Sequence, residues 1–274
     1  MSGINQHVVY SVTRICSEFC SDLGNEPIKS FGTGFFIKSQ DDETIFVTNK
    51  HMLDPSLSLG ATKGYSLKSI ELQLRSKSNL SHTKFIILTS YKIENSRDSD
   101  VSVIYDIEIP PDNNYDYISP HVFPISDLAD EDFFQNTLKI VDPASFIGFA
   151  GTRSSSWWDT GNNLPIARHA NIASLPQINF NNPSIKTTEV ILVSGFSFQG
   201  SSGSPTFSHL KKNNITPENY STPKIIGIMS GHMIDDQYDE MFNHTGLSYF
   251  TKSTALLALL ANLTGLKSRS GANK

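Results

Sequence analysis

The chain has 274 residues, of which 38% are hydrophobic and 18% charged, a composition typical of globular proteins with a substantial core and without long disorder. Its formal net charge is −5 at pH 7, and no block of Lys and Arg stands out along it. Because nucleic acids are bound mainly through such basic clusters, we expect no nucleic acid partner.

The first twenty residues predict a cytoplasmic protein without disulfide bonds. Residues 1–12 lack the basic start, the apolar run and the cleavage site of a signal peptide. The two cysteines, Cys16 and Cys20, cannot form the several disulfides typical of secreted domains, and no nearby histidine completes a metal site with them. We therefore expect two unpaired thiols, no bound metal and no other cofactor.

Short runs rich in β-branched and aromatic residues recur between clusters of turn-forming residues. They cover Val8–Ile15, Gly34–Ile37, Thr44–Thr48, Phe85–Leu88, Val101–Tyr105, Leu138–Val141, Val190–Val193 and Lys224–Met229. Runs of this length and spacing are typical of β-strands joined by turns. The sequence therefore predicts an all-β fold.

One helix is predicted, near the C-terminus. Its apolar residues follow the i, i+3, i+4, i+7 rule and are Leu256, Leu259, Leu260 and Leu263. Ser253 is expected to cap this helix and Gly265 to end it. The longest apolar cluster, Ala255–Leu263, is far too short to cross a bilayer, so we expect no membrane partner.

A histidine stands at the end of an apolar strand. In the run Ile45–Leu53, His51 lies just before the turn-forming pair Asp54-Pro55, where a base would project into a cleft. The glycine-rich run Gly32–Ile37 precedes it. A single histidine is usually a structural residue, so its position alone does not indicate catalysis.

An aspartate enters the β-branched run Asp98–Ile104. We favour Asp100 as a candidate partner for the histidine. Taken alone, this segment predicts only the start of a strand, and Asp98 or Asp106 fits equally well.

The segment Gly200–Pro205 reads Gly-Ser-Ser-Gly-Ser-Pro. Acyl transfer needs a nucleophile on a tight turn whose own N–H, with that of a residue two positions earlier, faces the developing oxyanion. Ser202 is the candidate nucleophile, and Gly200 and Ser202 would supply the two donors. Without the other two segments, such a run is more often a plain turn.

Together the three segments resemble the chymotrypsin-like serine peptidases, whose catalytic residues follow one another in the order His, Asp, Ser. The chain looks most like the trypsin-like peptidase domains of bacterial cytoplasmic proteins and, more distantly, the high-temperature-requirement proteases. The runs Ile147–Phe149 and Asn162–Arg168 are similar to the stretch that these domains carry before the nucleophile. The resemblance spans roughly Val8 to Leu263.

This resemblance implies a chymotrypsin-like double β-barrel closed by the C-terminal helix. Residues 1–120 would form an N-terminal barrel with His51 and Asp100, and residues 121–274 a C-terminal barrel with Ser202. It also implies a serine endopeptidase acting on protein or peptide substrates, in which His51 is the general base, Asp100 orients it and Ser202 attacks. A catalytically silent protease fold used for binding is the alternative.

The resemblance further implies residues that contact the substrate. Ser230, Gly231 and His232 would lie on the binding strand, and Phe196 would form the floor of the specificity pocket. A floor without a carboxylate leaves a buried Lys or Arg unpaired, which favours apolar or small residues before the cleaved bond. The acidic loop 235–240 would change this expectation if it folded inward.

Two further positions carry expectations. Trp157 and Trp158 are predicted either to shape a substrate cleft or to pack against the barrel. Ser201 stands where the secreted digestive relatives have an aspartate that pairs with a freed α-amino group. A hydroxyl cannot neutralise a buried ammonium, so we expect no activation by trimming of the N-terminus.

Overall fold

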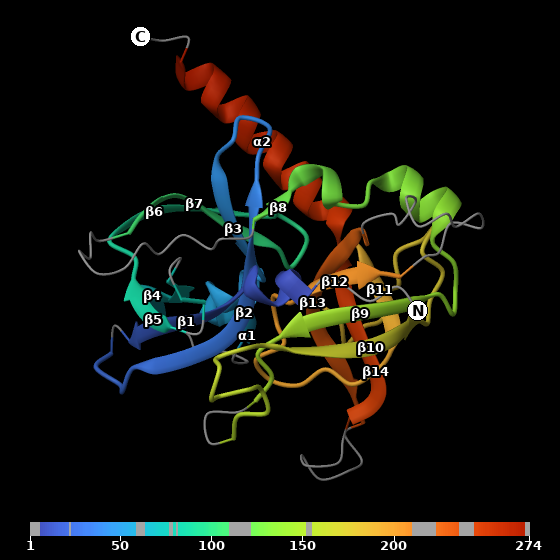
Figure 1. Cartoon of the computed structure of the whole chain (residues 1–274), viewed down its shortest axis with the longest axis horizontal. Helices are drawn as coiled ribbons and strands as arrows, with labels where there is room; N and C mark the ends of the chain where they lie inside the picture. Colours follow the sequence, from blue (N-terminus) through green and yellow to red (C-terminus); the bar gives the residue numbers. More distant parts are fainter. Residues whose placement is uncertain are drawn as a thin grey trace.

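The computed structural model describes residues 6–21, 23–58, 64–76, 79–80, 82–109, 122–151, 155–209, 223–235 and 244–271. Fourteen strands form two sheets in this part of the chain. Figure 1 shows the two sheets side by side. The expected all-β architecture with a C-terminal helix is therefore confirmed.

The N-terminal sheet is a curled half-barrel. Its strands are β1 (Val12–Ser21), β2 (Ile28–Lys38), β3 (Thr44–Thr48), β4 (Tyr65–Arg75), β5 (Thr83–Ile87), β6 (Ser90–Asn95), β7 (Ser102–Glu108) and β8 (Phe123–Pro124). They run in the order β5-β4-β1-β2-β3-β7-β6, and β8 pairs in parallel with β2. Since no pairing joins β5 to β6 in the described part of the chain, this sheet stays open there.

The C-terminal sheet is a closed barrel. Its strands are β9 (Pro143–Gly148), β10 (Ile166–Ile172), β11 (Val190–Ser194), β12 (Pro205–Ser208), β13 (Ile225–Ile234) and β14 (His244–Lys252). The order around the barrel is β10-β11-β14-β13-β12-β9. The expected boundary between two barrels, at residue 120, lies outside the described residues and stays a prediction.

Short helices connect these strands. They are η1 (Gln6–Tyr10), η2 (Lys50–Met52), α1 (Pro55–Ser58), η3 (Ile125–Asp127) and η4 (Phe133–Thr137). The first of them replaces expected strand residues. Val8 and Val9 belong to η1, and β1 begins only at Val12. The expected strand Leu138–Val141 is wrong: Val141 has a φ of 70° in a turn ahead of β9, a conformation that strands do not use.

Alternating side chains of β2 and β3 face two different hydrophobic cores. Phe35 and Val47 belong to a core that also holds Ile147 and Ile228 from the barrel. Phe36 lies between Phe35 and Ile37 in the chain, which both belong to the first core, but its own side chain packs in a second core inside the N-terminal sheet. Because successive side chains of a strand point to opposite faces, β2 and β3 separate the two cores and are apolar on both sides. The first core therefore joins the two sheets.

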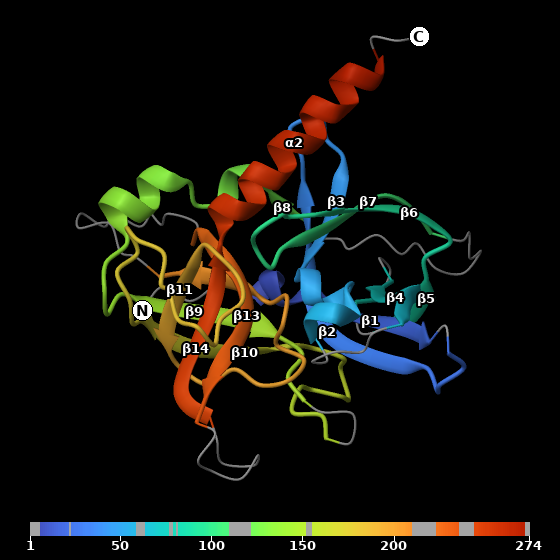
Figure 2. The same ribbon diagram turned by 180° about the vertical axis from the view of Figure 1, so that it is seen from behind.

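The C-terminal helix α2 (Ser253–Gly271) packs on the core between the sheets. Leu256, Leu259, Leu260 and Leu263 are all buried there, as their spacing predicted. Figures 1 and 2 show its far end extending away from the strands. Gly265 does not end this helix, since one interior glycine costs only about 1 kcal/mol. Ser253 is the first residue of the helix, as expected for its start, and its hydroxyl donates to the Ala129 carbonyl at 2.6 Å.

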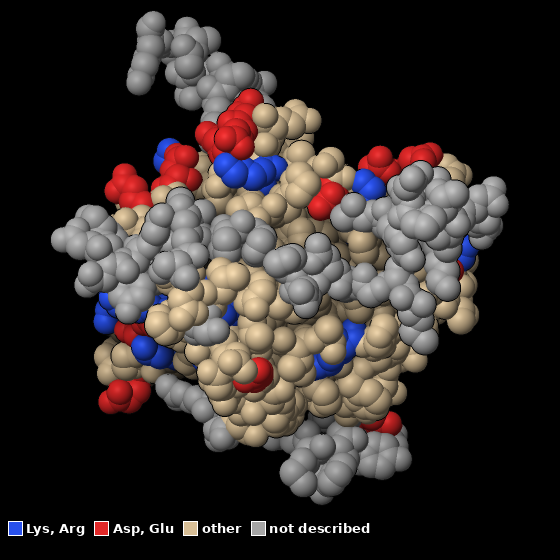
Figure 3. Space-filling model, in the orientation of Figure 1, with Lys and Arg blue, Asp and Glu red and all other residues tan. Residues whose placement is uncertain are grey.

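Both cysteines lie on β1 and are free, as expected. Four strand positions separate them by about 13 Å, well beyond the reach of a disulfide. No helix among the described residues is long and apolar enough to cross a membrane. On the face shown in Figure 3, basic side chains lie in small separate groups, several beside acidic ones.

Candidate active site

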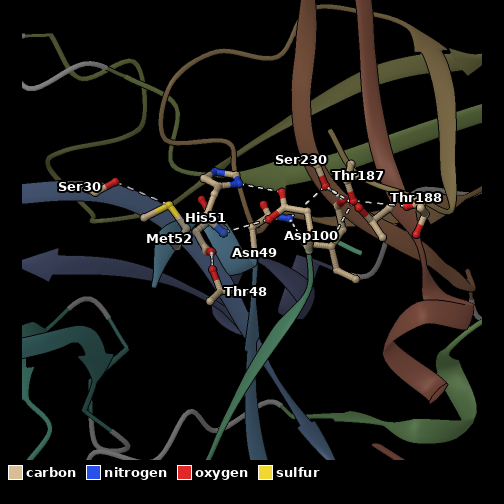
Figure 4. Close-up of polar contacts among 12 residues, drawn as sticks. Ser30, Thr48, Asn49, His51, Met52, Asp100, Thr187, Thr188 and Ser230 are labelled. Atoms are coloured by element: carbon tan, nitrogen blue, oxygen red, sulfur yellow. Dashed lines mark hydrogen bonds and ion pairs between the residues drawn. The ribbon is translucent and has the colours of Figure 1, made fainter. Parts of the chain in front are cut away.

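The pairing of β3 with β7 brings His51 and Asp100 together. Thr48 at the end of β3 pairs with Ser102 at the start of β7, so the residues beyond these ends are neighbours. The Nδ1 atom of His51 lies 2.7 Å from Oδ2 of Asp100, and the His51 backbone N–H donates to Oδ1 at 3.0 Å (Figure 4). Because an ionised carboxylate only accepts, Nδ1 carries the proton and Nε2 is left as an acceptor.

The backbone of Asp100 is held from the barrel side. Its N–H donates to Oγ1 of Thr187 at 2.7 Å. The side-chain amide of Asn49 donates to the Asp100 carbonyl at 2.8 Å and to the Ser230 hydroxyl at 3.0 Å, as Figure 4 shows. Asp100 is thus held by Asn49, which directly follows β3, and by Thr187, which precedes β11.

Asp100 also sets the charge state of the histidine. Burial lowers the pKa of His51, but the charge of Asp100 and its hydrogen bond raise it, and the net shift is upward. Neither alternative acid takes this place among the described contacts. Asp98 lines the same cavity without a side-chain bond to His51, and the carboxylate of Asp106 binds Lys92 at 2.7 Å.

The turn that carries Ser202 packs tightly against β2. The carbonyl of Ser202 accepts a hydrogen bond from the backbone N–H of Thr33 at 2.8 Å, and Gly203 donates to the Met229 carbonyl at 2.9 Å. Gly203 has a φ of 88°, and an added Cβ would lie 1.8 Å from the Thr33 carbonyl oxygen. Only glycine fits this close approach, so the turn and β2 hold each other in place.

Two backbone donors on this turn have no partner among the described residues, and they are the N–H groups of Gly200 and Ser202. The donors of the neighbouring Ser201, Gly203 and Ser204 are all bonded. The Gln199 carbonyl accepts from the Gly151 N–H at 2.8 Å, which fixes the orientation of the planar Gln199–Gly200 peptide. The two groups predicted to bind an oxyanion are thus available for one.

Two neighbouring cavities open beside these residues. One, of about 710 Å³, is lined by His51 and Asp100, and the other, of about 260 Å³, is lined by Ser202. Ser230 and Tyr249 line both. No hydrogen bond joins the Ser202 hydroxyl to His51 in the described part of the structure. Catalytic contacts of this kind often tighten only when substrate binds.

The expected substrate-binding residues fall into two groups. Ser230, Gly231 and His232 line the cavity beside Ser202. Phe196 does not line it and is 54% exposed, so it does not form a buried floor. Its ring lies against Phe198 and His244, with centroids 6.3 and 4.7 Å apart. The neighbouring Ser197 and Phe198 take up the cavity wall instead.

The histidine on this wall is uncharged at neutral pH. Burial and the nearby His244 lower the pKa of His232 to about 4. The two rings are stacked with centroids 4.4 Å apart. The wall is therefore polar but carries no positive charge there. Within the described residues, no three His, Cys, Asp or Glu side chains are grouped so as to hold a metal ion.

Sequence reasoning missed several residues that hold the site together, namely Thr33, Asn49, Arg168, Thr187 and Tyr249. Asn49 and Thr33 lie inside the motifs that drew attention to the site, and a polar residue within or directly after an apolar strand was a signal. Thr187 and Tyr249 stand in ordinary sequence. Thr187 acts through a hydrogen bond that crosses 87 residues of chain, and Tyr249 lines both cavities.

Comparisons with known proteins indicate the fold only. No family model matches the chain, and no curated protein matches it. The thermostable serine protease AL20 from an extremophilic microorganism is similar in structure, with 11% identity, a TM-score of 0.53, and coverage of 94% of this chain and 99% of that one. The protease domain of MamO from Magnetospirillum magneticum has 9% identity, a TM-score of 0.50, and coverage of 92% and 97%. Deg5 has 16% identity, a TM-score of 0.46, and coverage of 82% and 81%. The first two show that the chain has a chymotrypsin-like fold.

Proposed function

We propose that the chain is a serine endopeptidase in which Ser202 is the nucleophile, His51 the general base and Asp100 the residue that orients it. The 2.7 Å contact between His51 and Asp100, beside the cavity of Ser202, carries this proposal. The two unpaired backbone donors on the turn support it, because peptide hydrolysis needs them.

In the first half of the reaction, Nε2 of His51 takes the proton of the Ser202 hydroxyl, and the oxygen attacks the peptide carbonyl. The carbonyl oxygen becomes an oxyanion between the N–H groups of Gly200 and Ser202. Collapse breaks the C–N bond, and His51 gives its proton to the leaving amine. In the second half, water repeats these steps on the acyl-enzyme and releases the acid.

The test of this proposal is labelling with a fluorophosphonate, which forms a covalent bond with an activated serine. We expect wild type to take up one label per chain and to hydrolyse an unfolded protein substrate, and Ser202→Ala and His51→Ala to do neither. Ser204→Ala is the matched control, because the Ser204 hydroxyl is buried without a hydrogen-bond partner and should be dispensable. Equal labelling of wild type and Ser202→Ala would contradict the assignment. A wild type without labelling or hydrolysis would support the binding module instead.

The cavity beside Ser202 predicts which residues precede the cleaved bond. None of the described residues that line it carries a carboxylate, and His232 is neutral at pH 7. An unpaired Lys or Arg there would cost about 1–3 kcal/mol, which lowers kcat/KM by roughly 5- to 150-fold. We therefore expect a peptide library to be cleaved after small or apolar residues, with Ser202→Ala as the control for contaminating proteases. Preferential cleavage after Lys or Arg would be incompatible with this cavity.

The two adjacent tryptophans are expected to have separate effects. Trp157 is 47% exposed and meets Phe198, a cavity residue, edge to face at 4.9 Å. Trp158 packs on the core beside Phe149, with the Arg14 guanidinium 5.1 Å from its ring. Trp157 thus fits the expectation of a residue at the substrate cleft, and Trp158 fits that of a residue packed on the core.

We predict that Trp157→Ala lowers kcat/KM by about 2- to 10-fold with little change in thermal stability. Trp158→Ala should lower the free energy of unfolding by roughly 2–4 kcal/mol and leave peptide kinetics unchanged. Kinetics and thermal unfolding of the two variants decide this. If both changes affect stability alone, Trp157 has no part in the substrate cleft.

A further inference from the structure

An arginine of the barrel reaches the turn that carries Ser202. Arg168 lies on β10, and its guanidinium donates to the Ser201 hydroxyl at 3.2 Å and to the Phe196 carbonyl at 3.3 Å. It also lies over the Phe198 ring, 5.0 Å from the centroid. Burial lowers the pKa of Arg168 to about 10, so it remains a cation at pH 7. Among the described residues, no carboxylate is within ion-pair distance of it.

Ser201 closes the turn from inside. Its side chain is buried, and its hydroxyl accepts a second hydrogen bond from the N–H of Phe198 at 3.3 Å. In return, the Ser201 N–H donates to the Phe198 carbonyl at 2.9 Å. The peptide between Gln199 and Gly200 lies within this closed loop. Gly200 precedes Ser201 and Ser202 follows it. A contact that fixes Ser201, such as the hydrogen bond from Arg168, therefore also restrains both available N–H donors.

We propose that Arg168 is a positioning residue that, through Ser201, holds the N–H groups of Gly200 and Ser202 toward the oxyanion. This inference rests on the proposed function. The cation that orders the turn is then the Arg168 side chain of β10. A freed α-amino group, which orders this turn in the secreted digestive relatives, is not needed.

Because no described carboxylate pairs with Arg168, its charge should also stabilise the transition state directly. A partly buried cation without a counter-ion is costly, and the ground state offers no negative charge to offset it. The oxyanion supplies such a charge only in the transition state. Interactions that exist only there raise kcat and leave KM almost unchanged.

The test is Arg168→Met, which keeps the length and apolar contacts of the side chain and removes its charge and donors. We expect kcat to fall by about 10- to 100-fold, somewhat less than for the loss of an oxyanion donor itself, with KM within about 2-fold. Thermal stability should hold or rise, because replacing a buried charge by an apolar group is often neutral or stabilising. If Arg168 had a purely structural role, Arg168→Met would lower thermal stability and leave kcat unchanged.

Arg75→Met is the matched control. Arg75 is a buried arginine whose pKa burial likewise lowers to about 10, and it donates to the backbone carbonyls of Leu80 and Asn163. It has no contact with the nucleophile turn among the described residues. We expect this variant to keep kcat within about 2-fold of wild type, whatever it does to stability.

Two more variants sharpen the result. Ser201→Ala should lower kcat by about 10-fold, because it removes the bridge but keeps the cation. Arg168→Ala should be partly restored by added guanidinium ion, whereas Arg75→Ala should not change. If wild type hydrolyses peptides and Arg168→Met keeps its kcat, this inference fails and the proposed function stands. If wild type neither hydrolyses peptides nor takes up the fluorophosphonate label, both fail.

Discussion

Asp100→Asn is expected to lower kcat by about 10⁴-fold while the fold stays intact. Asp100 accepts two hydrogen bonds from His51, one from the backbone N–H and one from Nδ1. An amide has one accepting oxygen, so its NH₂ group would face Nδ1. The imidazole would then carry its proton on Nε2 and could not take one from Ser202.

The pH dependence of the residual activity distinguishes this cause from a general loss of structure. In wild type, Asp100 raises the pKa of His51, so activity should rise as the pH increases through that raised pKa and the ring becomes neutral. In Asp100→Asn only the lowering by burial remains, so the same limb should move to lower pH. The stability linked to His51 is present below its unfolded pKa and lost as pH rises through its folded pKa, and this variant should lack it.

Asp98→Asn is the control for this prediction. Asp98 lines the same cavity but has no described side-chain bond to the histidine. We expect it to keep kcat within about 3-fold of wild type. If Asp98→Asn is the damaging change and Asp100→Asn is not, the acid has been assigned wrongly.

The sequence predicted strands best where a short run is mostly apolar, although the buried strands β9 and β12 were not predicted. The run Thr44–Thr48 coincides with β3, and Val190–Val193 lacks only the last residue of β11, because both are short apolar segments with buried side chains.

By contrast, β4 and β14 were missed. In β4 the buried Ile70, Leu72 and Leu74 alternate with polar residues, which is the pattern of a half-buried strand and could have revealed it. In β14 the buried side chains include the polar Ser248 and Thr251, so its pattern is weaker.

The three proposed catalytic residues could be chosen from local motifs, but their support could not. Thr33 is the clearest case, since its hydroxyl donates to the Gly200 carbonyl at 2.6 Å and accepts from the Phe149 N–H at 3.0 Å. These contacts cross 167 and 116 residues of chain and exist only because the two sheets share a core. No periodicity or spacing records such pairings, and a motif that implies Gly200 says nothing about what holds it.

The support of Gly200 leads to the second large effect, which is expected for Gly200→Ala. Gly200 has a φ of 81°, and an added Cβ would lie 2.2 Å from the Phe149 carbonyl oxygen. A backbone atom cannot yield as a flexible side chain does, so the Gln199–Gly200 peptide must move. We expect kcat to fall by about 10²- to 10³-fold, as for the loss of one oxyanion donor, with a smaller change in KM.

Gly24→Ala separates this effect from backbone strain alone. Gly24 has a similar φ of 76°, but an added Cβ would meet nothing within 4 Å. Both variants therefore incur the strain of a left-handed alanine, about 1–2 kcal/mol of stability. Only Gly200→Ala also meets a backbone atom and displaces a donor. Unfolding measurements should therefore show a loss of stability at least as large as for Gly24→Ala, and kinetic measurements a much larger loss of turnover. If both variants keep wild-type kcat, the N–H of Gly200 does not bind the oxyanion, and the turn must stabilise it through Ser202 alone.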